Sequence, residues 1–260
     1  VAHRLPAPGG GVVSAIVHLG RWQDTIPDVE CDAVISDPPY GQRTHERALG
    51  ADDDRTPIDY AHWTPADVAA FVSSWAPRTR RWIVGMTSHD LIPSWEGAFA
   101  AAGWQSFAPL GIVITGMGVR IQGDGPANWT IHLVVARRRG YLAADGKIWR
   151  SLPGGYTGPA TPDMAGGRGK PRWLLDALVR DYSDEGHTIV DPFAGWGSTL
   201  VAARNASRIA IGSEVDPDAH ARCQAAIAGD MRAYARLGKR PARGPDPARP
   251  GLFDAIGGAR

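Results

Sequence analysis

Short apolar runs that end at polar or turn-forming residues recur along the first half of the chain. The run CDAVIS at 31–36 is apolar and stops at Asp-Pro-Pro, so it predicts a buried strand. The same pattern predicts further strands at 12–17, 82–86, 110–115 and 130–136. The first half is therefore expected to be rich in strands.

Helical signals and one long polar stretch lie between these runs. Thr64 and Pro65 combine an N-cap with a proline at the first helical position, which predicts a helix to about Trp75. Residues 94–104 predict a second helix. The stretch 41–63 is too hydrophilic to pack in a core, and a loop of that length is usually functional or disordered.

Strands and helices alternate quickly in the last third of the chain. Apolar side chains fall on one helical face after Pro171, and a strand ending at Asp191 follows. The pattern then predicts a helix at 198–206, a strand at 208–214 and a helix at 217–228. This alternation is typical of an α/β domain whose mostly parallel central sheet carries helices on its faces.

Composition narrows the class of protein. A chain of 260 residues with 43% hydrophobic residues suits one α/β domain with a tail, and a net charge of +1 does not by itself indicate a nucleic-acid binder. The two cysteines and the histidines lack metal-ligand spacing, so no metal is expected, and few cysteines fit a reducing, cytoplasmic location. Neither a signal peptide nor a membrane span is expected, because no long apolar run occurs.

Two predicted strand ends carry unusual residues, and ligands bind at the carboxyl ends of strands in such sheets. After the strand that ends at Asp191, Gly195 and Gly197 allow a sharp turn into a helix. Glu214 follows about twenty residues later, where a carboxylate can bind both hydroxyls of a ribose. Leu200 stands where a dinucleotide fingerprint has its third glycine, so the G-x-G pattern alone is weak.

The other strand end reads Asp37-Pro38-Pro39-Tyr40. Consecutive prolines fix two φ angles and stiffen the loop. The Asp37 carboxylate and the Pro38 carbonyl are two acceptors suited to an exocyclic NH2 group, and the Tyr40 ring suits a planar base taken out of its stack. An ordinary Asp-Pro turn with Tyr40 packed on the core is the alternative interpretation.

Four ordered motifs decide between these interpretations: DPPYG at 37–41, KPxxLL at 170–175, DPFAGxGST at 191–199 and IGSEVDPD at 211–218. Together they resemble the DNA amino-methyltransferases that use S-adenosylmethionine, in the circularly permuted beta group, where the catalytic motif precedes the cofactor motif. The resemblance implies a Rossmann-like methyltransferase domain.

The resemblance also divides the chain into parts. It implies a methyltransferase domain over 1–236, with a catalytic half at about 12–136, a recognition insert at about 137–169 and a cofactor half at about 170–228. Residues 237–260 are expected to form a flexible tail rich in proline, glycine and arginine.

Residue roles follow from the same resemblance. The catalytic group would be Asp37, Pro38, Pro39 and Tyr40. The cofactor would be bound by Asp191, Phe193, Ala194, Gly195, Gly197, Ser198, Glu214, Lys170 and Asp24. Asp24 is assigned with a shifted register, because the Gly-Asp pair usual upstream of the catalytic strand is absent here, and Trp196 replaces the small residue usual between the two glycines.

Double-stranded DNA is the expected partner. The predicted nucleic-acid contacts are Arg137, Arg138, Arg139, Trp149, Arg150, Arg168 and Arg43, in a basic segment interleaved with aromatics; an exposed charged loop is the alternative. Trp63 is a further candidate for base contact. The recognition insert is short, so a short site, relaxed specificity or a second subunit forming a homodimer is expected. Any nuclease partner would be a separate chain.

The expected reaction is methylation of adenine at N6, because Asp at the first position of the catalytic motif is more typical of adenine enzymes in this family. Cytosine-N4 methylation is the first alternative. A catalytically inactive nucleic-acid-binding protein of the same fold is the second, and the intact catalytic and cofactor motifs speak against it. A dinucleotide oxidoreductase is a third, disfavoured by the missing glycine and the Pro-Pro pair.

Overall fold

The computed structural model describes residues 14–42, 61–116, 130–140, 151–161 and 169–237. Within these residues a nine-stranded sheet has the order β1-β9-β8-β2-β3-β6-β5-β7, and β4 pairs with β6 beside that path. The strands are β1 (Ala15–Leu19), β2 (Cys31–Ser36), β3 (Thr79–Thr87), β4 (Trp104–Ser106), β5 (Leu110–Thr115), β6 (Thr130–Arg138), β7 (Gly155–Pro159), β8 (Thr188–Asp191) and β9 (Ile209–Glu214).

The sheet is mixed but mostly parallel. Strands β1, β9, β8, β2 and β3 pair in parallel, and β5 pairs in parallel with β7. Among the described strands only β6 runs against the others, because it pairs antiparallel with β3, β4 and β5. The predicted α/β class with a mostly parallel sheet is confirmed.

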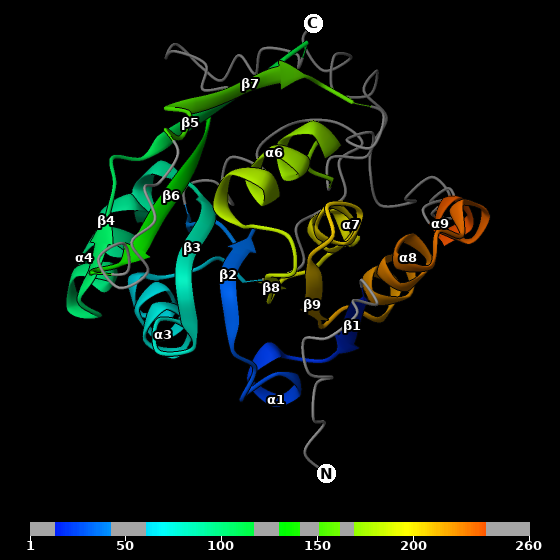
Figure 1. Cartoon of the computed structure of the whole chain (residues 1–260), viewed down its shortest axis with the longest axis horizontal. Helices are drawn as coiled ribbons and strands as arrows, with labels where there is room; N and C mark the ends of the chain where they lie inside the picture. Colours follow the sequence, from blue (N-terminus) through cyan, green and yellow to red (C-terminus); the bar gives the residue numbers. More distant parts are fainter. Residues whose placement is uncertain (1–13, 43–60, 117–129, 141–150, 162–168, 238–260) are drawn as a thin grey trace, which may run out of the picture.

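Helices cover both faces of this sheet (Figure 1). Helices α3 and α4 lie on one face, and α6, α7 and α8 lie on the other. The helices are α1 (Trp22–Thr25), α3 (Pro65–Trp75), the 3-10 helix η1 (His89–Leu91), α4 (Ile92–Ala101), α6 (Arg172–Tyr182), α7 (Ser198–Asn205), α8 (Pro217–Ala228) and α9 (Met231–Leu237).

The central strand β2 divides two apolar cores. Val34 belongs to the core under α3 and α4, which contains Phe71 and Trp95, whereas Ile35 belongs to the core under α6, which contains Leu178. Successive side chains of a strand point to opposite faces, so Val34 and Ile35 enter different cores, and each is fully buried there. A strand buried on both faces reads as a continuous apolar run, and this is why its bounds were predictable.

Several predicted elements have the observed bounds. Strands β2 and β5 and helix α8 coincide with the predictions, and α3 begins at Pro65 after a capping box between Thr64 and Asp67. The segment 137–169, expected to form the recognition insert, contains two pieces of regular structure for which no strand was predicted. Strand β6 continues to Arg138, and β7 adds an edge strand in which Tyr156 is buried.

Other predictions concern residues that the structure does not describe. Most of the polar stretch 41–63 and most of the tail 237–260 lie outside the described residues, although α9 reaches Leu237.

The first predicted strand is observed as Ala15–Leu19, shifted toward the C-terminus. None of the described helices has the length and apolar character needed to cross a membrane.

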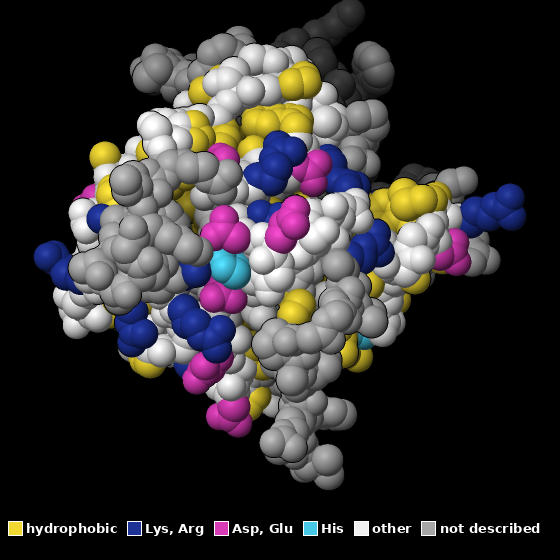
Figure 2. Space-filling model, in the orientation of Figure 1, with side chains coloured by type: hydrophobic (Ala, Val, Ile, Leu, Met, Phe, Trp, Pro, Cys, Tyr) yellow, Lys and Arg dark blue, Asp and Glu magenta, His cyan; other side chains and the backbone are white. Residues whose placement is uncertain are grey.

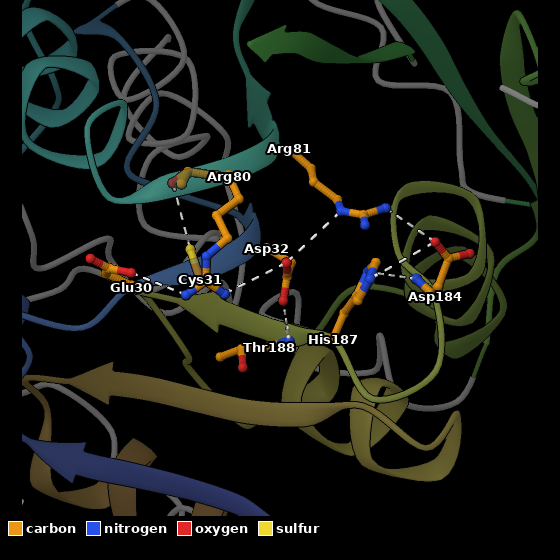
Figure 3. Close-up of polar contacts among 9 residues, drawn as sticks. Glu30, Cys31, Asp32, Arg80, Arg81, Asp184, His187 and Thr188 are labelled. Carbon is orange, nitrogen blue, oxygen red and sulfur yellow. Dashed lines mark hydrogen bonds and ion pairs between the residues drawn. The ribbon is translucent and has the colours of Figure 1, made fainter. Parts of the chain in front are cut away.

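A chain of charged side chains crosses the amino-terminal edge of β2, β3 and β8, on the side of the sheet away from the carboxyl ends (Figure 3). Asp32 lies at its centre. One carboxylate oxygen of Asp32 accepts a hydrogen bond from the Thr188 N–H at 3.0 Å. The other lies 3.8 Å from Arg80 and 3.9 Å from Arg81. The network thereby ties three neighbouring strands together.

Replacing Asp32 with Ala is expected to lower the free energy of unfolding by about 1–3 kcal/mol, because the Thr188 N–H loses its acceptor and the largely buried Arg81 guanidinium loses one of its two carboxylate partners. The matched control is Glu30→Ala. Glu30 pairs with Arg80 in an exposed ion pair, so its loss should cost less than about 0.5 kcal/mol. Urea unfolding of both variants checks the difference, and equal costs would contradict this account of the network.

Candidate active site

Three acidic side chains stand at the carboxyl ends of three adjacent strands. Asp37 follows β2, Asp191 ends β8 and Glu214 ends β9. These strands are parallel neighbours, with Val34 of β2 paired to Val190 of β8. The two motifs singled out in the sequence therefore meet at one edge of the sheet, although more than 150 residues separate them along the chain.

The loop after β2 holds Asp37 and Tyr40 against each other. The Tyr40 hydroxyl donates a hydrogen bond of 2.9 Å to Asp37 Oδ1. Tyr40 is half-buried and packs on the core under α6. The alternative interpretation, in which Tyr40 packs on the core, is therefore correct for part of its side chain. Gly41 closes the loop: its N–H donates to Ser88 Oγ at 2.9 Å, and a Cβ there would meet the Asp90 carboxylate. The loop is thus fixed on both sides.

Lys170 reaches the same carboxylate from the segment before α6. Its ammonium donates a hydrogen bond to Asp37 Oδ2 and forms an ion pair with it. The ammonium also lies 5.4 Å from the centroid of the Tyr40 ring. Asp37 and Lys170 are both partly exposed, with side-chain exposures of 29% and 18%. The lysine predicted from sequence to bind the cofactor is thus in contact with the predicted catalytic acid.

Asp191 is completely buried and joins the two loops. Ser36, the last residue of β2, donates a hydrogen bond of 2.6 Å from Oγ to Asp191 Oδ1, and the Phe193 N–H donates to the same oxygen at 3.1 Å. Burial raises the pKa of Asp191 to about 6, and the hydrogen bonds from Ser36, Thr199 and Phe193 oppose that rise. Ser36 is a site residue to which the sequence interpretation gave no role.

This raised pKa predicts a pH dependence of stability. The ordinary pKa is 3.8, so between about pH 4 and 6 the folded chain keeps a proton that the unfolded chain releases. The stability contributed by Asp191 is therefore present below about pH 4 and is lost as the pH rises through about 6. The wild type should lose about 2–3 kcal/mol relative to Asp191→Asn between about pH 4 and pH 7. Urea unfolding across that range tests this, and a constant difference would contradict it.

The glycine-rich turn after Asp191 needs both of its glycines. Gly195 has φ +53° and Gly197 has φ +85°, in the left-handed region that side chains with a Cβ rarely adopt. A Cβ on Gly197 would also lie 2.6 Å from Cys223 Sγ of α8. Ala194 is buried below this turn, and its N–H donates to the Ser213 carbonyl of β9 at 2.9 Å. Ser198 begins α7 directly after the turn.

Glu214 supports the same turn from the neighbouring strand. Its Oε2 accepts a hydrogen bond of 2.8 Å from the Gly195 N–H, and its Oε1 accepts one of 2.8 Å from the Asp216 N–H. The side chain is half-buried. Each carboxylate oxygen keeps further lone pairs for a ligand.

Asp24 is exposed and lies on the short helix α1 beyond the end of β1. Thr25 of the same helix is hydrogen-bonded to Ser213 of β9, with 2.9 Å between the hydroxyl oxygens. Helix α1 is thus anchored at the carboxyl end of β9, one residue before Glu214. The structure brings Asp24 to the same edge of the sheet as the glycine-rich turn.

Aromatic side chains connect the two loops. The Trp63 N–H donates to the Tyr40 carbonyl at 3.0 Å, and the Trp63 ring packs edge-on against Phe193 with 5.4 Å between centroids. Trp63 is therefore a packing residue between the catalytic and glycine-rich loops, in addition to its candidacy for base contact. On the other side of the turn, Arg222 of α8 stacks on the Trp196 ring at 3.6 Å and on Tyr234 of α9 at 4.2 Å.

The three predicted DNA-contacting arginines that the structure describes are not brought to this edge. Arg137 pairs with Trp82 near the start of β3, so the reversed direction of β6 carries Arg137, Arg138 and Arg139 to the edge opposite Asp37. Arg138 and Arg139 line a groove there beside α3 and α4. In the view of Figure 2, the described basic side chains are interleaved with acidic ones across the middle of the face. Arg43, Trp149, Arg150 and Arg168 lie outside the described residues.

No group of three or more His, Cys, Asp or Glu side chains forms a candidate metal site in the part of the chain that the structure describes. The polar groups at this edge of the sheet are instead carboxylates, which accept hydrogen bonds, and backbone N–H groups and one ammonium, which donate them. This set suits an organic ligand that carries hydroxyl, amino and carboxylate groups.

Comparisons with solved structures establish the fold. M1.HpyAVI in complex with S-adenosylmethionine matches with a TM-score of 0.59 and 15% identity, over 82% of this chain and 100% of that one. TTHA0409 of Thermus thermophilus, complexed with S-adenosylmethionine, matches with 0.56 and 18%, over 84% and 94%. The PvuII DNA methyltransferase, which is cytosine-N4-specific, matches with 0.57 and 11%, over 85% and 91%.

Sequence comparison gives a narrower result. A search of curated proteins found no match. Residues 168–225, from the lysine segment to α8, match the DNA methylase family N6_N4_Mtase. This segment contains Lys170, the glycine-rich turn and Glu214. Residues 168–225 are thus similar to the N6/N4 DNA methylase family, and the chain as a whole is similar in fold to the solved structures above.

Proposed function

We propose that this DNA amino-methyltransferase transfers a methyl group from S-adenosylmethionine to the exocyclic N6 amine of an adenine flipped out of double-stranded DNA. The observation that carries the proposal is the position of Asp37. Its carboxylate lies at the carboxyl end of β2, beside the Tyr40 ring and next to the strand that bears the glycine-rich turn. The Asp37 carboxylate, which can accept hydrogen bonds from an amine, and the Tyr40 ring, on which a base can stack, thus lie next to a glycine-rich turn of the kind that binds nucleotides.

The residues at the turn fit S-adenosylmethionine. Glu214 is half-buried at the end of β9, where its carboxylate can accept hydrogen bonds from ribose hydroxyls. The nearest atom to a Cβ built on Gly195 is 4.0 Å away, so this part of the turn is open to close approach by a ligand. Phe193 and Ala194 supply apolar contact, and Lys170 is a cation suited to the carboxylate of the methionine part.

When bound, S-adenosylmethionine supplies a methyl group activated by a sulfonium sulfur. An aromatic amine is a poor nucleophile, because its lone pair is delocalised into the ring. Asp37 and the Pro38 carbonyl would accept hydrogen bonds from the two amine hydrogens and draw the nitrogen toward tetrahedral geometry. The Asp37 carboxylate also stabilises the positive charge that develops on the amine. Positioning and electrostatics therefore account for most of the rate enhancement.

Tyr40 would stack on the flipped base, and the two prolines keep its ring fixed relative to Asp37. Unstacking the base costs a few kcal/mol, which stacking on Tyr40 and hydrogen bonds to its amine would offset. Among the predicted DNA contacts, Arg137, Arg138 and Arg139 lie on the far edge, so they could grip only a different stretch of backbone.

Cytosine-N4 methylation is the second candidate. One of the similar folds is the cytosine-N4-specific PvuII enzyme, and cytosine offers the same kind of exocyclic amine on a smaller ring. Adenine is preferred because Asp37, and not a serine, begins the catalytic motif. The acceptors at Asp37 and Pro38 serve either base, so the choice depends on the rest of the base pocket.

The experiment uses S-adenosylmethionine with a deuterated methyl group and unmethylated genomic DNA from several sources. After digestion, mass spectrometry of the nucleosides should show labelled N6-methyladenine. Labelled N4-methylcytosine would replace the first proposal by the second. Label in RNA or protein but not in DNA would reject the substrate class.

A further inference from the structure

Lys170 occupies the place that a target base needs. Both oxygens of Asp37 are engaged: Oδ1 accepts from the Tyr40 hydroxyl at 2.9 Å, and Oδ2 accepts from the Lys170 ammonium. A base amine that binds Asp37 must compete with these two donors for the carboxylate. The Lys170 ammonium is only 5.4 Å from the centroid of the Tyr40 ring, so it also lies close to where a base would stack.

The two donors differ in how easily they can leave. Tyr40 is three residues from Asp37 in a loop stiffened by two prolines, so its hydroxyl has little freedom to move away. Lys170 carries its charge on a flexible four-carbon stem and comes from a segment 133 residues away. Lys170 is therefore the donor that gives way when a base enters.

A partly buried ammonium that leaves Asp37 needs another anion, because an unpaired charge in this position is costly. The remaining acids of the edge are engaged. Asp191 is completely buried under hydrogen bonds from Ser36 and Phe193. Glu214 accepts from two backbone N–H groups, and its remaining lone pairs are assigned to the ribose of the cofactor. The carboxylate of a methionine moiety bound at the adjacent turn is an anion of the required kind.

We propose that Lys170 couples cofactor binding to base entry: it pairs with Asp37 in the free protein and moves to the carboxylate of the cofactor, which leaves Asp37 free for the base amine. This inference rests on the proposed function, because it requires the cofactor site at the glycine-rich turn. Lys170 is in this account a positioning residue, which acts on the base through Asp37. Its consequence is ordered binding, with the cofactor before the base.

Cofactor affinity tests the coupling without any knowledge of the DNA site. The cofactor must compete with Asp37 for Lys170, and a ligand that needs a state only partly populated binds more weakly by that fraction. Asp37→Asn removes the competing charge, so it should tighten binding of S-adenosylhomocysteine by about threefold or more. Lys170→Met should weaken that binding by about three- to tenfold.

S-adenosylhomocysteine is the appropriate probe because it keeps the carboxylate but has no sulfonium charge that Asp37 could attract directly. The double variant completes a thermodynamic cycle. With Lys170 absent, Asp37→Asn should change the affinity by less than about 1.5-fold. 5′-Methylthioadenosine lacks the amino-acid part altogether, and its affinity should change by less than about 1.5-fold in all three variants.

Calorimetric titration of the folded variants measures these affinities. Arg172→Met is the matched control, because Arg172 is two residues from Lys170 but pairs with Asp176 on its own helix, and it should change no affinity by more than about twofold. Equal effects of Asp37→Asn with and without Lys170, or equal effects on both ligands, would overturn the coupling alone. A wild type that binds neither S-adenosylmethionine nor S-adenosylhomocysteine would overturn the proposed function together with it.

Discussion

Replacing Asp37 with Asn is expected to reduce methyl transfer to DNA by about a hundred- to a thousandfold, while the chain stays folded and binds cofactor. Asn has the shape of Asp, but it loses the negative charge that stabilises the developing positive charge on the amine. Loss of one such electrostatic contact in a transition state typically has an effect of this size. Initial rates at saturating cofactor and DNA measure it.

The matched control for this variant is Asp184→Asn. Asp184 is also partly exposed and paired with a cation, Arg81, but it lies in the network at the opposite edge of the sheet (Figure 3). Its replacement should leave the rate within about twofold of the wild type, since Asp184 lies away from the candidate site and shares no partner with Asp37. If the two variants kept similar rates, Asp37 would not be the acceptor for the amine.

Gly197→Ala is expected to have the largest effect on cofactor binding. The added Cβ would meet Cys223 Sγ at 2.6 Å at a residue whose φ is +85°, so the turn must move. We expect a loss of about 2–4 kcal/mol in the free energy of unfolding and at least about a tenfold loss in affinity for S-adenosylmethionine. Urea unfolding and calorimetric titration measure the two quantities.

Gly229→Ala separates the effect of backbone strain at a positive φ from the effect of the close contact with Cys223. Gly229 has a similar φ of +75° at the end of α8, but nothing lies within 4 Å of a Cβ built there. Its replacement should cost about 1 kcal/mol of stability through backbone strain and should leave cofactor affinity unchanged. If Gly229→Ala weakened the cofactor as much as Gly197→Ala, the close approach of the turn to Cys223 would not be the reason.

The sequence predicted the parts of the fold in which local pattern and burial agree. Strand β2 has a run of apolar residues from Ala33 to Ile35 because both of its faces are buried there, and α3 begins at a capping box formed by Thr64 and Asp67, which lie close together in the sequence. Strand β7 was not predictable in this way. Its sequence, GYTGP, has the composition of a turn, and it is a strand because its backbone pairs with β5 and Tyr156 packs in the core.

In the candidate site, too, the features set by local sequence could be predicted and those set by tertiary packing could not. Asp37, Asp191 and Glu214 could be placed at one edge from sequence, because each ends a predicted parallel strand. The contact between Lys170 and Asp37 could not, since it joins segments 133 residues apart and depends on how α6 docks on the sheet. The roles assigned to these residues stay predictions until variants are measured.

The arginine run shows how a strand direction changes an interpretation. In the sequence, Arg137 to Arg139 follow a predicted strand and adjoin the basic segment, so they read as part of one DNA-binding surface. Strand β6 runs antiparallel to β3, and its end therefore lies at the edge away from Asp37. Hydrophobic periodicity predicts a strand but not its direction, so this separation became visible only in the fold.

In the proposed function, Asp37 holds a DNA base amine beside a cofactor bound at the glycine-rich turn. Transfer of tritium from methyl-labelled S-adenosylmethionine to unmethylated double-stranded DNA, compared between the wild type and Asp37→Asn, tests it most directly. We expect label in DNA with the wild type and almost none with Asp37→Asn, although both bind the cofactor. Bound cofactor without any label in DNA from the wild type, or equal label from both proteins, would contradict it.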